Sequence, residues 1–441
     1  MTLDEKLERI RIYSEIVSRL ALAEKLGYQF GGDRNIYGTL GYPKTITFND
    51  YLAKYIRQDI AGAVINKPAN ATWKNGFEII EADEEETKFE KSWKELNKRL
   101  GLVSKFQRLD KLACLGRYAV LLLGLDDVKN RSDFAKPVLG QRKLLYVTPY
   151  SEKQAVIQEF QTNTNDPRYG LPLYYNINTT EPGGNTITIR VHYSRVIHVV
   201  YERLDSENYG MPVLEGIFNR LLDLEKVVGG SAEMFWKGAR PGYYGKLLED
   251  FDLTLEEQEE LEAQIDEYEH NLRRFLIARG IDLSPLSMQV AEPDKHVDVI
   301  LQMISARTNI PKRILIGSER GELASKDDRN TWNEFIENRR INFAEAEIIR
   351  PFIDRCIDFG ILPEPESYSI HWPPLSVMGE KEKAEISKTK AGALSEYAKN
   401  PMVMDIMPPE AFYRFILGLS NDEIELIEEL LGNAEGEESE E

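Results

Sequence analysis

The sequence has few of the residues on which metal and thiol sites depend. Its only cysteines, Cys114 and Cys356, lie far apart in apolar surroundings, which indicates reduced thiols rather than a disulfide framework. None of its five histidines forms an H-x-x-x-H pair or lies beside a cysteine, so neighbouring residues do not supply a zinc site. We therefore expect no metal and no cofactor.

Long apolar runs are also missing. The longest, Ala119 to Leu123, is far shorter than the ~20 residues of a membrane-spanning helix. The first residues are charged and helical in pattern, unlike a secretory signal. We therefore expect no contact with a membrane. The sequence also has no G-x-x-x-x-G-K-[ST] phosphate loop and no G-x-S-x-G nucleophile turn, which argues against a P-loop ATPase and a serine hydrolase.

Basic residues are absent from one segment, the last 21 residues. Ten acidic side chains fall there, so the rest of the chain carries −9 of the net charge of −19. Tight binding of nucleic acid needs clustered Lys and Arg. The charge therefore disfavours a protein that grips DNA, but it is compatible with a surface past which DNA slides.

The apolar pattern predicts an α+β fold that is mainly helical. Helical spacing covers residues 1–30, 49–65, 100–115, 212–237 and 294–308, and a long helix from 328 towards 360. Pro68 should lie just past the end of one helix, and Pro351 should interrupt another. Short strands separated by turn signals dominate residues 143–200, which predicts a small β-rich unit inside the helical chain.

Two polar groups have plain structural interpretations. His192 and His198 are six residues apart, which places them on one face if their strand is unbroken; we interpret them as partly buried strand residues. The acidic residues 256–269 follow a capping box, Thr254 to Glu257. That segment is most simply a solvent-facing helix, because it lacks the alternating ligands of a calcium loop.

Four local patterns, in this order and spacing, resemble a branch of the tailed-phage portal family. They are Leu112 to Leu122, where a helix meets a strand through Gly116; Arg168 to Tyr175 followed by Val191-His192-Tyr193-Ser194-Arg195-Val196; Phe235 to Pro241; and Ile304 to Leu323. The second is the most specific. The resemblance covers roughly residues 45–360.

The resemblance implies a portal-type fold, in which a ring of about twelve copies surrounds a central channel. Such a subunit has an α/β wing, a helical stem, a clip and a helical crown. On this pattern we expect a wing in residues 1–293, a descending stem helix in 294–308, a clip in 309–327, an ascending stem helix in 328–340, a tunnel segment with return to the wing in 341–375, a crown in 376–431 and a disordered acidic tail in 432–441.

The resemblance also places candidate channel residues, by position only. Residues 341–349 should hold the tunnel loop, with these charged side chains at or beside the narrowest point: Arg339, Arg340, Glu345, Glu347 and Arg350. Mixed charges would give weak, screened contacts with phosphates, so DNA could move past them. Ordinary charged positions on a continuous helix are the alternative.

Candidate contact residues lie in the expected clip and in the ascending stem helix after it. The charged set is Lys312, Arg313, Glu319, Arg320, Glu322 and Lys326, which would meet the terminase or connector proteins; solvated loop charge is the alternative. The apolar set is Trp332, Phe335 and Ile336, which has the spacing of a helix stripe. That stripe would pack either on a neighbouring stem helix or inside its own chain.

The family's expected partners are further copies of the chain, the terminase large subunit, the major capsid and scaffolding proteins and a head-completion protein. Double-stranded DNA would pass through the channel without sequence-specific contacts. The expected location is the capsid vertex of the virion, reached by assembly in the host cytoplasm. Two other classes stay open: a head–tail adaptor or other capsid assembly protein, and a metal-dependent phage nuclease or hydrolase.

Overall fold

The computed structural model describes residues 35–427 apart from short gaps. The residues outside the description are 1–34, 82–85, 181–182, 239–242, 248–253, 270–280, 286–291, 318–321, 376–379, 400–402, 404–405, 419–423, 425–426 and 428–441. The chain divides into two compact units, Met1–Pro373 and Pro374–Glu441. The expected N-terminal helix and acidic tail lie outside the described residues.

The first unit opens with helices that the sequence predicted only in part. The described helices before the sheets are α2 (Ile36–Thr39), α3 (Phe48–Arg57), α4 (Asp59–Thr72), α5 (Lys88–Leu100) and α6 (Leu102–Leu115). The single helix expected over 49–65 is wrong. Gln58 is extended, and its side chain accepts a hydrogen bond from the Ala61 amide to start α4. Pro68 lies inside that helix rather than past its end.

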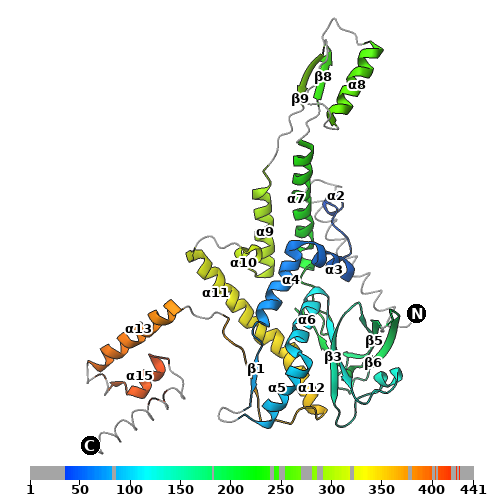
Figure 1. Cartoon of the computed structure of the whole chain (residues 1–441). Helices are drawn as coiled ribbons and strands as arrows, with labels where there is room; N and C mark the ends of the chain where they lie inside the picture. Colours follow the sequence, from blue (N-terminus) through cyan, green and yellow to red (C-terminus); the bar gives the residue numbers. More distant parts are fainter. Residues whose placement is uncertain are drawn as a thin grey trace, which may run out of the picture. The chain divides into compact units, whose positions relative to one another are not determined.

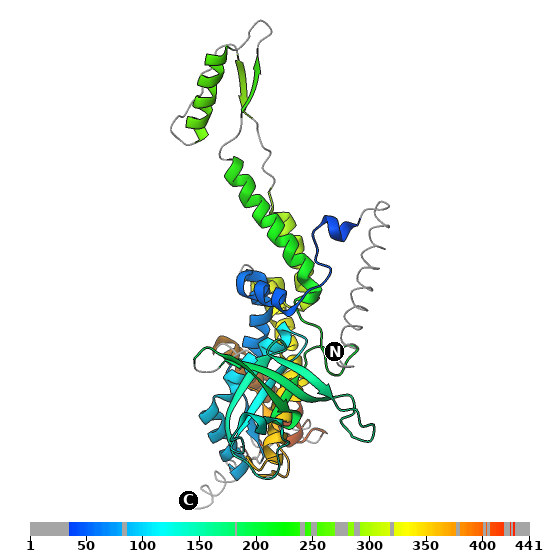
Figure 2. The same cartoon turned by 90° about the vertical axis from the view of Figure 1, so that its right-hand side faces the viewer.

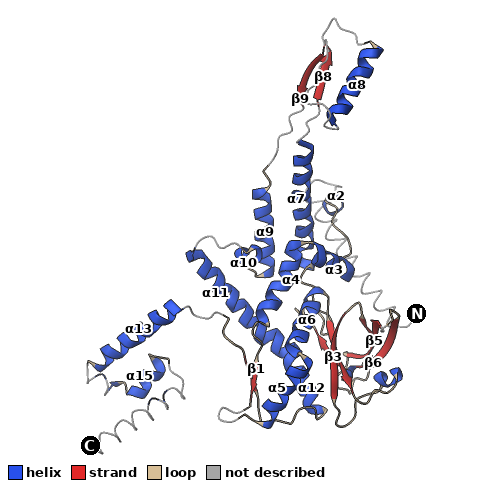
Figure 3. Ribbon diagram, viewed as in Figure 1, coloured by secondary structure: helices blue, strands red, loops and turns tan. Residues whose placement is uncertain are grey.

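Two antiparallel three-stranded sheets follow (Figures 1 and 3). One has the order β3-β2-β7, from β2 (Ala119–Leu125), β3 (Leu144–Ser151) and β7 (Val196–Val199). The other has the order β4-β5-β6, from β4 (Ala155–Phe160), β5 (Pro172–Thr180) and β6 (Thr186–His192). The β-rich segment 143–200 is confirmed, but β2 joins it from outside, and the strands form two sheets rather than one.

Short 3₁₀ turns link these strands, η1 (Arg131–Ala135) between β2 and β3 and η2 (Tyr193–Arg195) between β6 and β7, and a third, η3 (Glu215–Ile217), follows β7. The turn η2 separates β6 from β7, so His192 and His198 belong to different sheets. The strand is therefore broken between them, and the condition for a shared face is not met. In the turned view the cyan and green strands lie together in the lower part of this unit (Figure 2).

Two long helices stand side by side after the sheets, α7 (Phe218–Gly238) and α9 (Asp294–Thr308) (Figure 1). They are antiparallel: Gly216, just before α7, lies beside Arg307 near the end of α9, whereas Leu224 and Val228 line one groove with Val297 and Leu301. Between them in the chain come β8 (Tyr243–Leu247), α8 (Leu255–Glu269) and β9 (Ile281–Pro285), with β8 and β9 paired antiparallel. The capping box at Thr254 and Glu257 is confirmed.

The segment after α9 differs most from expectation. It comprises α10 (Lys312–Ile316), α11 (Glu322–Arg339), the π-helix η4 (Arg340–Ile349) and α12 (Arg350–Asp358). The helical run α11–η4–α12 has no tunnel loop at 341–349 and no break at Pro351. Pro351 stands in the first turn of α12, where a helix has little need of its missing N–H. A last strand, β10 (Ser369–His371), pairs with β1 (Glu78–Ile80).

Three apolar clusters hold this unit together. The largest joins α5, α6 and β2 to η4 and α12. The second joins α4, the start of α7 and α9, and includes Ile310 and Leu315 from the expected clip. The third lies between the two sheets. Buried apolar side chains in residues 309–317 show that this stretch packs into the subunit instead of protruding as a clip.

The second unit is helical in its described part. It contains α13 (Glu380–Ala398) and α15 (Pro409–Phe415). Tyr397 stacks on Phe412, with ring centroids 4.0 Å apart, and both are buried with Leu417. The segment 376–431, which was expected to be helical, thus contains the described helices α13 and α15, while most of 421–431 lies outside the described residues.

Candidate functional site

Arg339, an expected channel residue, is buried inside the subunit. Its guanidinium donates to both carboxylate oxygens of Asp110, to Oδ2 over 2.8 Å, and to Thr72 Oγ1 over 2.7 Å. Trp73 Nε1 donates to the same carboxylate over 2.7 Å. Asp110 is fully buried and Arg339 is 4% exposed. A charge enclosed on all sides by its own chain cannot face a channel, so this assignment is wrong.

The other four expected channel residues also have partners within the subunit. Arg340 is buried and donates to the carbonyl oxygens of Thr72 and Pro373. Glu345 accepts a hydrogen bond from Trp372 Nε1 and pairs with Arg350 at 3.5 Å. Glu347 accepts two hydrogen bonds from Arg203, of 2.6 and 2.8 Å. Arg340 is thus excluded from a channel, and the three remaining residues hold η4 against its surroundings.

The five residues do not converge on one point. Arg339 and Glu347 line a cleft of about 850 Å³ between the end of α9, α11 and residues 200–203. Arg340 and Glu345 lie instead on the side of Trp372. The proposed alternative, charged positions on a continuous helix, is what the structure shows.

The expected clip residues are only partly described. Lys312 Nζ lies 2.6 Å from Asp298 on α9, and Arg313 Nε lies 3.6 Å from Asp328 on α11. These pairs tie α10 to its neighbours. Glu319 and Arg320 lie outside the described residues, as do the side chains of Glu322 and Lys326 at the start of α11.

The stripe Trp332, Phe335 and Ile336 packs inside its own chain, which was one of the two alternatives. Ile336 is fully buried, and Trp332 packs against the cluster formed by α4, α7 and α9. Phe335 lies beside Trp332, with ring centroids 5.6 Å apart, and lines the cleft. The helix that carries them, expected to be an ascending stem over 328–340, contacts α4 and the core instead.

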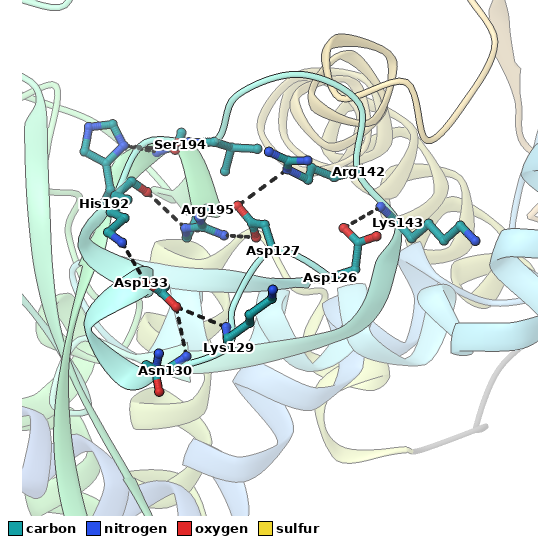
Figure 4. Close-up of polar contacts among 12 residues, drawn as sticks. Asp126, Asp127, Lys129, Asn130, Asp133, Arg142, Lys143, His192, Ser194 and Arg195 are labelled. Carbon is teal, nitrogen blue, oxygen red and sulfur yellow. Dashed lines mark hydrogen bonds and ion pairs between the residues drawn. The ribbon is translucent and has the colours of Figure 1, made fainter.

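The residues of the most specific sequence pattern hold a loop onto the sheets. Arg195 is 1% exposed and makes two hydrogen bonds of 2.7 Å to Asp127, while its Nε donates to the Lys136 carbonyl (Figure 4). Ser194 Oγ accepts from the Val138 amide and contacts His192 Nδ1 over 2.9 Å. The hydrogen bonds from Arg195 lower the pKa of Asp127, so the pair stays ionised. The pattern is thus structural: it positions residues 126–143.

The two sheet histidines are held neutral. Burial lowers the pKa of His198 to about 4, although the Asn208 carbonyl accepts from its ring. Its other ring nitrogen contacts the Tyr175 hydroxyl over 3.1 Å. Burial, and then the nearby Arg168, lower the pKa of His192 to about 4. These contacts confirm partly buried histidines.

The helix pair α7 and α9 has one feature that the sequence interpretation missed. The far half of α7 carries exposed apolar side chains, among them Val228, Phe235 and Trp236. Two glycines, Gly229 and Gly230, stand beside them inside the helix. Gly-Gly within a helical pattern next to apolar residues is a signal that the sequence alone could have provided.

Within the described residues, no three side chains of His, Cys, Asp or Glu gather as a metal site. No described helix combines the length and apolar character needed to cross a membrane. The described residues thus show two main features. One is a core that contains buried ion pairs, and the other is the helix pair α7 and α9, with exposed apolar side chains on α7.

A family model described as phage portal protein matches residues 49–396. That range covers well over half of the chain. The chain belongs to the phage portal protein family. The mainly helical α+β fold with small antiparallel sheets is the fold of a portal protein, and the resemblance seen in the sequence is confirmed.

Relatives of this portal protein are distant. One curated protein, anti-CBASS protein Acb1 of Sphingomonas paeninsulae, is 21% identical over 379 residues, covering 80% of this chain. The chain spans 58% of that relative's length. The neck of an empty gene transfer agent particle, computed with C6 symmetry, matches with 14% identity and a TM-score of 0.50, over 84% of this chain and 94% of the other. An HK97-family portal protein from Corynebacterium diphtheriae matches with 9% identity and a TM-score of 0.37, over 72% and 95%.

Proposed function

We propose that this portal protein assembles as a closed ring at one vertex of a virion and forms the channel through which double-stranded DNA enters and leaves. The supporting observation is the antiparallel pair α7 and α9, which carries between its two helices a separate β8-α8-β9 element. A structural role of this kind requires no catalytic group. We assign no reaction to the protein.

The helix pair replaces the expected stem and clip. We propose that α7 and α9 are the two stem helices, so that 294–308 keeps its stem role but as the returning helix. The clip then corresponds to the β8-α8-β9 element, and the tunnel segment to the chain between α9 and α11. The buried contacts of α10 and α11 support this shift, because elements packed into the core cannot project from it.

The acidic helix α8 would then form part of the docking platform for the terminase large subunit and, later, for head-completion proteins. Its exposed face carries a dense run of carboxylates, among them Glu256, Glu259, Glu260 and Glu262. Such a face favours a basic partner surface and accelerates encounter. The second unit would be the crown, which faces the capsid interior. Capsid and scaffolding proteins would assemble around the ring, and this assembly would take place in the host cytoplasm.

Cryo-electron microscopy of the purified full-length protein tests the ring. We expect class averages with a closed ring of about a dozen copies around an open centre. A protein that remains monomeric, or that forms only open fibres, would exclude a portal function and favour a different capsid assembly protein.

The docking assignment has a separate test. Glu259→Lys with Glu260→Lys should leave the ring intact and weaken capture of the purified terminase large subunit at least tenfold. The charge-matched control, Glu385→Lys with Glu410→Lys in the second unit, should bind terminase like the unmodified ring. Equal binding by both variants would show that α8 is not the platform.

A further inference from the structure

The face of α7 that lines the second core continues beyond the core. At 100° per residue, Leu224, Val228 and Phe235 fall within about 40° of one another around the helix axis. Leu224 is buried, whereas Val228 and Phe235 are 51% and 55% exposed, and the neighbouring Trp236 is 81% exposed. No described part of the subunit covers this face.

A groove begins on this face. It has a volume of about 320 Å³ and lies where α7 and α9 meet the start of α4; its lining includes Ile60, Leu224, Val228, Gly229, Val297 and Leu301. Apart from its chain neighbours and the backbone of its own helix, a Cβ added at Gly229 would meet nothing within 4 Å. Glycine inside a helix is destabilising relative to alanine, and the subunit's own packing does not require it here. The missing side chain keeps the groove open for something outside the subunit.

A ridge stands on the opposite side of α9. Val299 and Met303 each follow a groove residue, Val297 or Leu301, by two positions, which is a rotation of about 200° around the helix. They are 48% and 50% exposed, and Ala306, one helical turn further, is also exposed. One helix pair thus carries an apolar groove on one side and an apolar ridge on the other.

The charges beside the two faces are opposite in sign. Asp59 lines the groove and is exposed, and Glu225 beside it is paired with Lys54. Lys295 lies on the ridge side of α9 and is exposed too. Complementary charge at the rim of an apolar contact selects the partner and its register. The surface that the groove fits best is therefore the ridge of another copy.

We infer that a second copy of this chain places its ridge, Val299, Met303 and Ala306, in the groove beside Gly229. The inference rests on the proposed ring and names its contact. Because the two faces differ, the contact is head-to-tail: every copy offers a free ridge and a free groove. Repetition of one such contact closes into a ring when the rotation between copies permits.

Two single variants test the contact, Met303→Glu on the ridge and Gly229→Glu in the groove. Each alone should lose assembly and elute as a monomer in size-exclusion chromatography with light scattering. Mixed in equal amounts, they should form a dimer and nothing larger. The Met303 variant keeps its groove and the Gly229 variant keeps its ridge, so one intact contact remains available. A symmetric contact would not give this result.

Leu204→Glu is the matched control, because Leu204 is 82% exposed and lies outside both faces; it should assemble fully. If circular dichroism shows either glutamate variant unfolded, Met303→Gln and Gly229→Gln are measured instead. Assembly of either single variant, or a folded mixture containing only monomers, overturns the inference while the ring proposal stands. An unmodified protein that never assembles overturns both.

Discussion

The fold depends on both members of the buried ion pair between Arg339 and Asp110. Both are buried, and each fills the hydrogen-bonding needs of the other together with Thr72 and Trp73. Removing one member of a buried ion pair leaves an uncompensated charge, at a cost of about 3–5 kcal/mol. We therefore expect Arg339→Met to lower the free energy of unfolding by that amount, measured by urea denaturation at fixed protein concentration.

An exposed ion pair on the surface provides the control for Arg339→Met. Arg190 pairs with Glu159 at 2.8 Å, but both side chains are about two-fifths exposed, and such pairs contribute at most about 1 kcal/mol. Arg190→Met should therefore change stability little. Adding Asp110→Leu to Arg339→Met should recover most of the loss. If the two arginine variants lowered the free energy of unfolding equally, the buried Arg339–Asp110 pair would contribute no more than the surface pair.

His198 should make the protein less stable in mild acid. An unfolded chain binds a proton at histidine near pH 6.5, whereas the folded protein does so only near pH 4, the lowered pKa of His198. Between these values the unfolded state holds more protons, so stability falls as the pH falls. The lowered pKa of His198 corresponds to a loss on the order of 3 kcal/mol in the free energy of unfolding between pH 6.5 and 4.

Thermal unfolding at a series of pH values measures this effect. His198→Gln should flatten the dependence between pH 4 and 6.5, and His192, lowered for the same reason, accounts for part of what remains. His371→Gln, at an exposed position, should keep the full dependence. An unchanged slope in the His198 variant would contradict a buried neutral histidine.

Among the elements, the π-helix η4 occupies residues 340–349, where the resemblance placed a tunnel loop by position only. Its buried residues come in pairs, Phe343 with Ala344 and Ile348 with Ile349. The pairs are five residues apart, which matches the i to i+5 hydrogen bonds of a π-helix rather than the i to i+4 bonds of an α-helix. The apolar spacing predicted one long helix from 328 towards 360, but not this wider segment within it. The π-helix packs against β7 and inside the largest apolar cluster.

The turn after β7 depends on a glycine for a different reason. A Cβ at Gly210 would lie 1.9 Å from the backbone oxygen of Tyr201, in the bridge that pairs Arg203 with Gly210. Backbone cannot yield as a flexible side chain does, so Gly210→Ala should cost about 1–3 kcal/mol. Differential scanning calorimetry measures the resulting shift in the unfolding temperature. Gly38→Ala, whose nearest contact would be an ordinary 3.6 Å, should be nearly neutral; a similar shift in both would contradict this explanation.

Across the whole molecule, the sequence predicted what depends on local pattern. Helix α9 has the bounds expected from its apolar spacing, and the strands around the V-H-x-S-R-V pattern lie where alternation placed them. Roles that depend on distant partners were not predictable. Arg339 resembles an exposed helix residue until Asp110, more than two hundred positions earlier, is placed against it. The proposed stem differs from the expected one for the same reason, since only tertiary packing separates a projecting helix from a core helix.

The division into two compact units predicts where the chain can be truncated without loss of stability in the first unit. The three large apolar clusters lie before Pro373, and the fourth lies after it. A chain ending at Pro373 should keep the thermal unfolding midpoint of the first unit. Ending at Glu366 also removes β10 and Trp372, whose ring lies 5.2 Å from Phe77 and 5.7 Å from Trp73.

The shorter chain should therefore unfold at a clearly lower temperature, because burying an aromatic side chain contributes about 3–5 kcal/mol. Circular dichroism on both truncated chains, beside the full chain, decides the matter. Equal loss of stability in both would mean that the second unit supports the first. Equal retention would mean that β10 and Trp372 contribute little to the core they cover.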